Sequence, residues 1–296
     1  MFARISRSWR IFKNSLSVLS IHKKLMVFPL LSAIFIIAIV MLIFGGFFAT
    51  AIFSPETGAQ LSKMNEPETA QQTMQVLEIV VLFVAYFISV FCATFFNVAF
   101  YSEIIHGLNS QPVSLTRGFK FAFSKSSSIA MWALLGATVG VALKMLEERF
   151  GWLGQLVIRL IGLAWNVVTI FAAPVIICNE DSFNPITNLK KSAKVIKDTW
   201  GESLIGFLGI STLNGLLIIP IVLLTVVLAI ALGIVAGPVL AVIVGCLGFI
   251  AVVLISMLLS VAQKIYIASL YLYATEGFLN EAYDEELMQN PWKVKR

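Results

Sequence analysis

Charged residues are scarce in this chain. Asp, Glu, Lys and Arg make up 12% of its 296 residues, against 59% for hydrophobic residues, and the mean hydropathy is +0.92. An average soluble domain has about twice that share of charge, and one hydrophobic core could not enclose this much apolar surface. The composition therefore excludes an ordinary soluble domain and predicts a protein whose apolar surface faces lipid.

The groups that carry most enzyme chemistry are also few. The two histidines are His22 and His106, and no His-Glu-x-x-His, Gly-x-Ser-x-Gly or phosphate-binding glycine loop occurs in the sequence. Cys92, Cys178 and Cys246 each stand alone in or beside an apolar run, without Cys-x-x-Cys spacing. We therefore predict no disulfide, no metal site, no cofactor and no enzymatic activity.

The charges that are present are mostly positive, with 21 Lys and Arg against 16 Asp and Glu, a net charge of +5 and a pI near 9.1. A nucleic-acid-binding protein could show the same balance. Here, however, the basic residues form clusters that bracket apolar runs, and they do not form one continuous patch with interleaved aromatics. The pattern predicts anionic membrane lipids as partners and no nucleic acid, and it leaves open a protein partner or a homo-oligomer.

Apolar runs of the length that crosses a bilayer, roughly 20 helical residues, recur along the chain. The first, Leu25 to Phe53, is too long for the apolar region of a signal peptide and has bulky residues where cleavage would need small ones. The last stretch turns back at Gly233, Gly237 and Pro238. We predict an all-α integral membrane helical bundle with one transmembrane domain over 1–275, a cytoplasmic tail over 276–296, and spans at 25–53, 76–102, 128–146, 156–178, 204–233 and 238–262.

Lysine and arginine are distributed unevenly over the segments that join these spans. Lys63 and Arg149 lie clearly on one side, and most of the 21 lie on the other, in segments 4–24, 117–125, 190–197 and 293–296. Because cytoplasmic loops carry an excess of Lys and Arg, both termini are predicted to lie in the cytoplasm. A seventh span, made by splitting the fifth helix at Pro220, would put the C-terminal basic cluster outside and is disfavoured.

Three segments, each ahead of a pair of spans, combine apolar residues at helical spacing with basic residues beside or opposite them. The first predicts an amphipathic helix over 2–20, whose apolar face holds Phe2, Ile5, Trp9, Phe12, Leu16 and Leu19. The apolar face of a second segment holds Ile186, Leu189, Ala193, Ile196 and Trp200. A weaker third segment, which lies between these two in the chain, has an apolar face with Leu115, Phe119, Ala122 and Phe123. We infer three repeats of a cytoplasmic amphipathic helix followed by a transmembrane hairpin.

Such a helix can lie in the headgroup plane with its apolar face toward the hydrocarbon and its cations near the phosphates. It can also pack against the ends of the bundle with its cations in water. We favour lipid contact, and predict it for Arg4, Arg7, Trp9, Arg10, Lys13, Lys190, Lys194, Lys197 and Trp200.

The third and fourth predicted spans carry two further features. Gly136 and Gly140 form a Gly-x-x-x-Gly pair, which favours close packing of two helices. The tip between the spans holds a polar cluster. Such a cluster marks either a pathway through the membrane or a hairpin end whose charges neutralise one another, and we favour the hairpin end. Its residues are Lys144, Glu147, Glu148 and Arg159.

Short motifs run through nearly the whole chain: Ser8-Trp9, Phe28-Pro29, Leu146-Glu147-Glu148-Arg149, Ala164-Trp165, Pro174-Val175, KKSAKVIKDTWGE from Lys190 to Glu202, and a tail from Tyr273-Ala274-Thr275 to Tyr283-Asp284-Glu285-Glu286-Leu287. Together they resemble a family of prokaryotic multi-pass membrane proteins of unknown function. That family is distantly similar in style to the membrane domains of some glycerophosphodiester phosphodiesterases, whose catalytic domain has no counterpart here. The resemblance implies a helical bundle in a prokaryotic plasma membrane, and because the family has no established activity, it transfers no catalytic role to this chain.

Two functional hypotheses follow. The first is a non-enzymatic membrane module that organises lipid or a partner protein through its basic cytoplasmic helices. The alternative is a transporter or channel for a small solute or lipid, which would use the polar cluster at the hairpin tip and the asparagines inside the spans, Asn97, Asn166 and Asn214. A water-filled cavity lined by those residues would favour transport, whereas a dry, tightly packed bundle would favour the module.

The charge bias predicts how the chain is threaded. In a cysteine-free background, single cysteines at Lys63 and Gly151 should react with an impermeant thiol reagent added outside intact cells, whereas cysteines at Lys120, Lys194 and Lys293 should not. Labelling is measured by a mass shift on gels, with permeabilised cells as the control that every position can react. Labelling of position 293 in intact cells would contradict an even number of spans.

Overall fold

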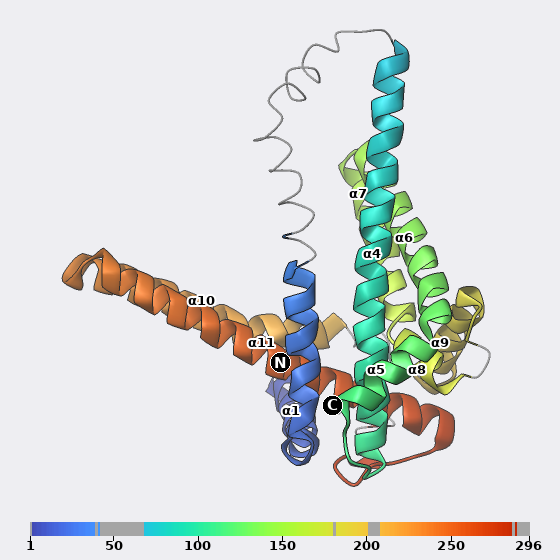
Figure 1. The fold of residues 1–296 in the computed structure, drawn as a ribbon. Helices are drawn as coiled ribbons and strands as arrows, with labels where there is room; N and C mark the ends of the chain where they lie inside the picture. The colour runs from blue at the N-terminus through green and yellow to red at the C-terminus, as the bar shows by residue number, and fades with distance from the viewer. Residues whose placement is uncertain are drawn as a thin grey trace. The chain divides into compact units, whose positions relative to one another are not determined.

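The computed structural model describes residues 2–38, 41, 68–179, 182–200, 208–285 and 288. Every regular element in these ranges is helical, which confirms the predicted all-α class (Figure 1). The elements are α1 (Phe2–Ile21), the 3-10 helix η1 (Lys23–Met26), a helix over 27–38, α4 (Glu68–Leu108), α5 (Leu115–Ser124), α6 (Ser126–Arg149), α7 (Trp152–Val168), α8 (Ala172–Cys178), α9 (Pro185–Trp200), α10 (Leu208–Ala236) and α11 (Pro238–Glu276).

Several segments within the described ranges are long and apolar enough to cross a membrane, so the chain is a helical membrane protein. The five that qualify alone are Ile79–Leu108, Ser126–Arg149, Gly154–Cys178, Ile218–Val235 and Pro238–Glu276. A sixth is added if Phe12–Ile21 and Lys23–Ala38, which are bent by 108° at the break between them, count as one. Residues 39–40 and 42–53 of the predicted first span, 25–53, lie outside the described residues, and the arrangement as three hairpins stays a prediction.

The boundary between the last two spans lies where the sequence predicts it. Gly237 separates α10 from α11 with a φ of 97°, a conformation that favours glycine, and Pro238 occupies the first turn of α11, where a missing N–H costs nothing. Pro220 lies inside α10, which continues past it. The α11 helix runs on to Glu276, well beyond residue 262, where the last span was predicted to end.

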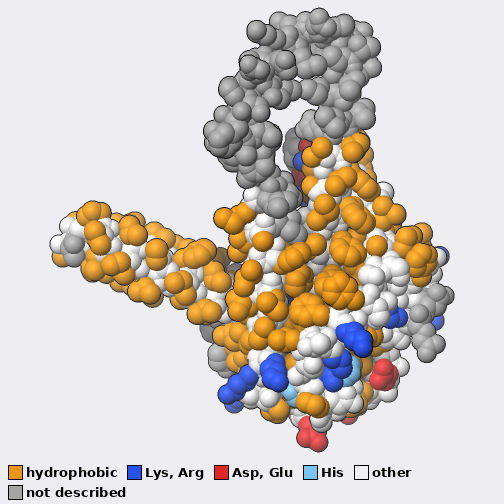
Figure 2. Space-filling model, viewed as in Figure 1, with side chains coloured by type: hydrophobic (Ala, Val, Ile, Leu, Met, Phe, Trp, Pro, Cys, Tyr) orange, Lys and Arg blue, Asp and Glu red, His pale blue; other side chains and the backbone are white. Residues whose placement is uncertain are grey.

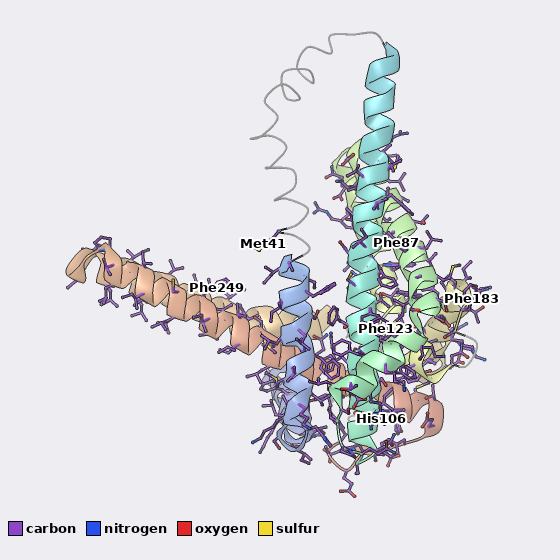
Figure 3. The ribbon with its side chains drawn as sticks, viewed as in Figure 1. Met41, Phe87, His106, Phe123, Phe183 and Phe249 are labelled. Carbon is purple, nitrogen blue, oxygen red and sulfur yellow. The ribbon has the colours of Figure 1, made fainter. Side chains whose placement is uncertain are left out.

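The chain forms two compact units. In the first (1–26, 101–115 and 190–296), α1 packs on α10 and α11. The second half of α11 is the buried part of that helix, from Leu259 to Leu272. The first half and α10 instead carry exposed large apolar side chains such as Phe249, which is 70% exposed, and Figures 2 and 3 show such side chains along the hairpin. Because the described part of the protein leaves these side chains exposed, these faces suit hydrocarbon.

The second unit (27–100 and 116–189) is built around aromatic side chains. Phe28 is buried and stacks on Phe100 with ring centroids 5.4 Å apart, and Phe119 of α5 lies 5.6 Å from Phe28. Trp132 of α6 stacks on Trp165 of α7 at 6.3 Å. These offset pairs anchor α5, α6 and α7 within the unit.

The Gly-x-x-x-Gly pair of α6 faces α4 at close range, as predicted. A Cβ added to Gly136 would lie 3.1 Å from Cγ1 of Val90, and one added to Gly140 would lie 2.9 Å from Cε1 of Tyr86. Ordinary carbon contacts need more space than that, so a larger residue would have to push the Val90 or Tyr86 side chain aside, and glycine suits this close approach of the two helices.

Filling this contact should destabilise the protein. We expect Gly140→Leu to lower the free energy of unfolding by roughly 1–3 kcal/mol, because the new side chain must displace the Tyr86 ring. Gly162→Leu on α7 is the matched control, since a Cβ there meets nothing within 4 Å. Thermal unfolding in detergent measures both, and Tyr86→Ala should recover part of the loss. Equal melting temperatures for the two leucine variants would contradict the contact.

Candidate functional site

The predicted basic helix at the N-terminus is α1, whose side chains the structure describes from Arg10 onward, apart from Ile11. Arg10 and Lys13 are exposed, whereas Ser15, Val18 and Leu19 are buried. The described half of α1 therefore combines buried residues with exposed cations, and the helix packs on α10 and α11. Arg4, Arg7 and Trp9 lie on the same helix, but their side chains fall outside the described part.

The segment that follows α11 returns to α1, and we name residues 277–285 and 288 the C-terminal clasp. It begins at Gly277, whose φ of 66° ends α11 in a left-handed cap, with Phe278 N–H bonded back to the Leu272 carbonyl. Asn280 then fixes the turn, donating from Nδ2 to the Leu108 carbonyl at 2.9 Å and accepting from Ala282 N–H. The segment predicted as a tail is thus ordered over the described residues.

Tyr283 is the centre of the clasp. It is 3% exposed, its ring lies 5.7 Å from that of Tyr266, and its hydroxyl shares a hydrogen bond of 2.7 Å with Ser15 of α1. Burial raises the pKa of Tyr283 above its usual range, although hydrogen bonds from Ser15 and Ser269 act in the opposite direction. The hydroxyl therefore keeps its proton at neutral pH, and the clasp fixes α1 through a neutral buried bond.

An ion pair lies at the edge of the same contact. Arg10 Nη2 is 3.4 Å from Asp284 Oδ2, with side chains 50% and 66% exposed. Pairs this exposed contribute little because water and salt screen them. Arg10 thus keeps access to other anions while Ser15 and Tyr283 hold the helix.

The second predicted basic helix is α9. Asn184 caps its N-terminus, accepting at Oδ1 from Ile186 N–H at 3.0 Å and Thr187 N–H at 3.3 Å, and Pro185 follows in the first turn. The exposed side carries Lys190, Lys191, Lys194 and Lys197. Trp200 ends the helix, and its side chain lies outside the described part.

The buried face of α9 differs from the predicted apolar stripe. Asn188 and Ser192 are fully buried and Ile196 is 4% exposed, whereas Ile186, which the periodicity placed on the packed face, is 52% exposed. The helix is therefore rotated so that polar side chains share its inward face and part of the apolar stripe faces outward.

A network that the sequence did not predict explains this rotation, and we name it the Lys125 latch. Lys125 Nζ donates to the Asn179 carbonyl at 3.1 Å and to Ser182 Oγ at 3.3 Å, and Ser182 also bonds to Ser128 Oγ at 2.9 Å. Asn188 Nδ2 donates to the Ser182 carbonyl at 2.6 Å. In the sequence, only the Asn184-Pro185 cap and the serine run that starts α6 could have pointed to this network.

The third predicted amphipathic helix is α5. Ala122 is buried, and Phe119 contacts Phe28 as described above. Phe123, predicted on the same stripe, packs its ring edge-on against Phe95 at 4.9 Å yet remains 67% exposed. Lys120 is exposed one turn before it.

The polar cluster at the tip between α6 and α7 is partly assembled. Arg159 Nε lies 3.7 Å from Glu147 Oε1, with side chains 70% and 44% exposed, and Lys144 and Glu148 are exposed. The structure thus brings Arg159 and Glu147 together at an open surface. Within the described ranges, no group of three His, Cys, Asp or Glu side chains could hold a metal ion.

A buried carboxylate at the end of α4 also escaped the sequence analysis. Glu103 is fully buried and accepts from Ser114 N–H at 2.7 Å, and His106 Nδ1 donates to the Ser102 carbonyl at 2.7 Å. Figure 3 shows His106 at this end of α4. The Glu103 bond fixes the loop that leads into α5, which is a structural role.

The clasp makes a testable contribution to stability. Tyr283→Phe should lower the free energy of unfolding by about 1–2 kcal/mol, because it leaves the buried Ser15 hydroxyl without this partner. Adding Ser15→Ala should restore part of the loss, since both polar partners are then removed. Arg10→Gln, which removes the exposed ion pair, should cost less than about 1 kcal/mol. Thermal unfolding in detergent compares the variants, and a Tyr283→Phe protein as stable as the parent would refute the bond's importance.

Comparison with known proteins gives a family but no function. No curated protein and no solved structure matches the chain. Residues 76–280, which include α5 to α11 and most of α4, match the model of a family of unknown function, DUF6159. Because this match covers more than half of the sequence, the chain belongs to the DUF6159 family.

Proposed function

We propose that the protein is a non-enzymatic membrane module that binds anionic lipid headgroups at the cytoplasmic face of a prokaryotic plasma membrane, and thereby organises lipid or a partner protein there. The charge distribution of α9 carries this proposal. Four lysines occupy the exposed side of this one helix, and its opposite side is buried through Asn188, Ser192 and Ile196. Such a helix has a fixed inward face and presents its cations outward.

The electrostatics of α9 favour an anionic surface over water alone. Lys190, Lys194 and Lys197 lie three or four residues apart on its exposed side, so these like charges repel one another. Each basic residue near an anionic leaflet contributes about 1 kcal/mol of attraction. Lipid phosphates would therefore relieve the repulsion and bind the helix at the same time.

The α1 helix supports the same conclusion. Arg10 and Lys13 are exposed, and the Arg10–Asp284 pair is too solvent-exposed to hold the guanidinium against a phosphate. The helix ends at Ile21, so α1 is not a continuation of the apolar helix over 27–38. A separate basic helix of this kind is typical of elements that lie at a membrane surface.

The transport hypothesis has less support. A pathway through the membrane would need its charges to line a shielded interior, but Arg159 is 70% exposed and its partner Glu147 44% exposed. This pairing suits a hairpin end that neutralises its own charge. We therefore carry lipid binding forward as the proposed function.

Removing charge from α9 should weaken the retention of anionic lipid. We expect Lys190→Gln/Lys194→Gln to reduce affinity for phosphatidylglycerol by about 2 kcal/mol, or roughly 30-fold, because each lysine contributes about 1 kcal/mol. The measurement is native mass spectrometry of the full chain in detergent, titrated with phosphatidylglycerol against phosphatidylcholine.

Lys144→Gln/Arg149→Gln is the matched control. It removes the same two positive charges from exposed positions at the far end of the α6 span, on the side predicted to lie outside. Its affinity for phosphatidylglycerol should stay close to that of the parent. Equal losses in the two double variants would mean that net charge alone governs retention, which would refute a site on α9.

A further inference from the structure

The exposed large apolar side chains of the second unit that lie outside its membrane-length helices include three at or beside α5 and α9. Phe123 at the end of α5 is 67% exposed, Phe183 ahead of α9 is 56% exposed, and Ile186 in the first turn of α9 is 52% exposed. Figure 3 shows Phe123 and Phe183 on the segments that the Lys125 latch joins. Hydrocarbon around the spans does not account for them, because none of the three belongs to a span.

The backbone beneath these side chains is rigidly held. Ser182, immediately before Phe183, is 2% exposed and takes part in the Lys125 latch, and Asn188, two residues after Ile186, is fully buried. Lys125, two residues after Phe123, supplies the ammonium of the same latch. Hydrogen-bonded polar residues therefore lie one or two positions from each exposed apolar side chain. The local backbone is fixed by these bonds, and the apolar side chains stay exposed on it.

Each helix also places a lysine one turn from its exposed apolar residue. Lys120 precedes Phe123 by three positions on α5, and Lys190 follows Ile186 by four positions on α9. Residues at these spacings are neighbours on a helix surface. An apolar side chain beside a long cationic one suits the boundary between acyl chains and phosphates. There the apolar side chain can enter the apolar layer while the lysine ammonium reaches the headgroups.

We infer that Phe123, Phe183 and Ile186 form an insertion edge, which enters the headgroup layer of an anionic leaflet while Lys120 and Lys190 contact its phosphates. The inference rests on the proposed function and adds to it the apolar half of the lipid site. The lysine beside Phe123 and the lysine beside Ile186 select an anionic bilayer as the occupant. A second copy of the chain would present the same lysines and repel them.

The test measures how deep these positions lie. In a background with Cys92, Cys178 and Cys246 replaced by alanine, Phe183→Cys and Phe123→Cys are labelled with an environment-sensitive fluorophore, and the full chain is placed in nanodiscs with or without phosphatidylglycerol. Both labels should emit at shorter wavelength, resist a soluble quencher and be quenched by lipid carrying a headgroup nitroxide. Lys191→Cys, on another side of α9, is the control and should stay open to the soluble quencher.

The lipid dependence separates this inference from the proposed function. Lys120→Gln/Lys190→Gln should increase soluble quenching at position 183 several-fold in discs with phosphatidylglycerol, because the cations that hold the edge are gone. A label at 183 as open to the soluble quencher as one at 191 would overturn the insertion edge, even if anionic lipid is still retained. Deep labels with no preference for anionic lipid would instead overturn the proposed function. Protection that disappears when each disc holds one chain would assign the edge to a second copy and also overturn the inference.

Discussion

Hydrocarbon offers no hydrogen-bond partner to a backbone amide or carbonyl, and this constraint shapes every membrane-length segment described here. The segments are helices because a helix bonds its own backbone. The same requirement extends to hydroxyl side chains within them: Ser89, Thr138 and Thr225 each donate to the carbonyl four residues earlier. A polar residue can therefore occupy a span without needing a partner on another helix.

Polar side chains that bond over long sequence distances gather instead at the ends of helices. The Lys125 latch joins the start of α6 to the residues before α9, and the C-terminal clasp joins the residues after α11 to α1. Asparagines organise both segments, Asn184 by capping α9 and Asn280 by closing a turn. The clasp fixes α1 within the first unit, and the latch fixes the start of α9 within the second, so each set of bonds positions a basic helix and not a span.

Periodicity and turn chemistry predicted several helix positions, but not the break between α7 and α8 or the end of α11 at Glu276. The amphipathic segment 2–20 corresponds to α1, the Gly237-Pro238 turn separates α10 from α11, and Gly136 and Gly140 face a neighbouring helix closely. The clasp could not be predicted because it depends on Ser15, Tyr283 and Asn280, single polar residues far apart in sequence. The latch was missed for a related reason: Lys125 counted as a cytoplasmic cation, and a charge count cannot tell that its ammonium bonds a carbonyl and a hydroxyl.

The rotation of α9 shows why an apolar stripe does not identify the surface on which a helix packs. Its inward face contains Asn188 and Ser192, and Asn188 is held there by a bond to the Ser182 carbonyl. Once side-chain hydrogen bonds fix a helix, its apolar residues are no longer needed for packing against protein, and Ile186 is left outward. Folding gains no free energy from a large apolar side chain that stays in water, so contact with an apolar surface would stabilise Ile186 where its backbone is already fixed. The proposed insertion edge supplies such a surface, since the headgroup layer of an anionic bilayer would cover Ile186 and bind Lys190 one turn away.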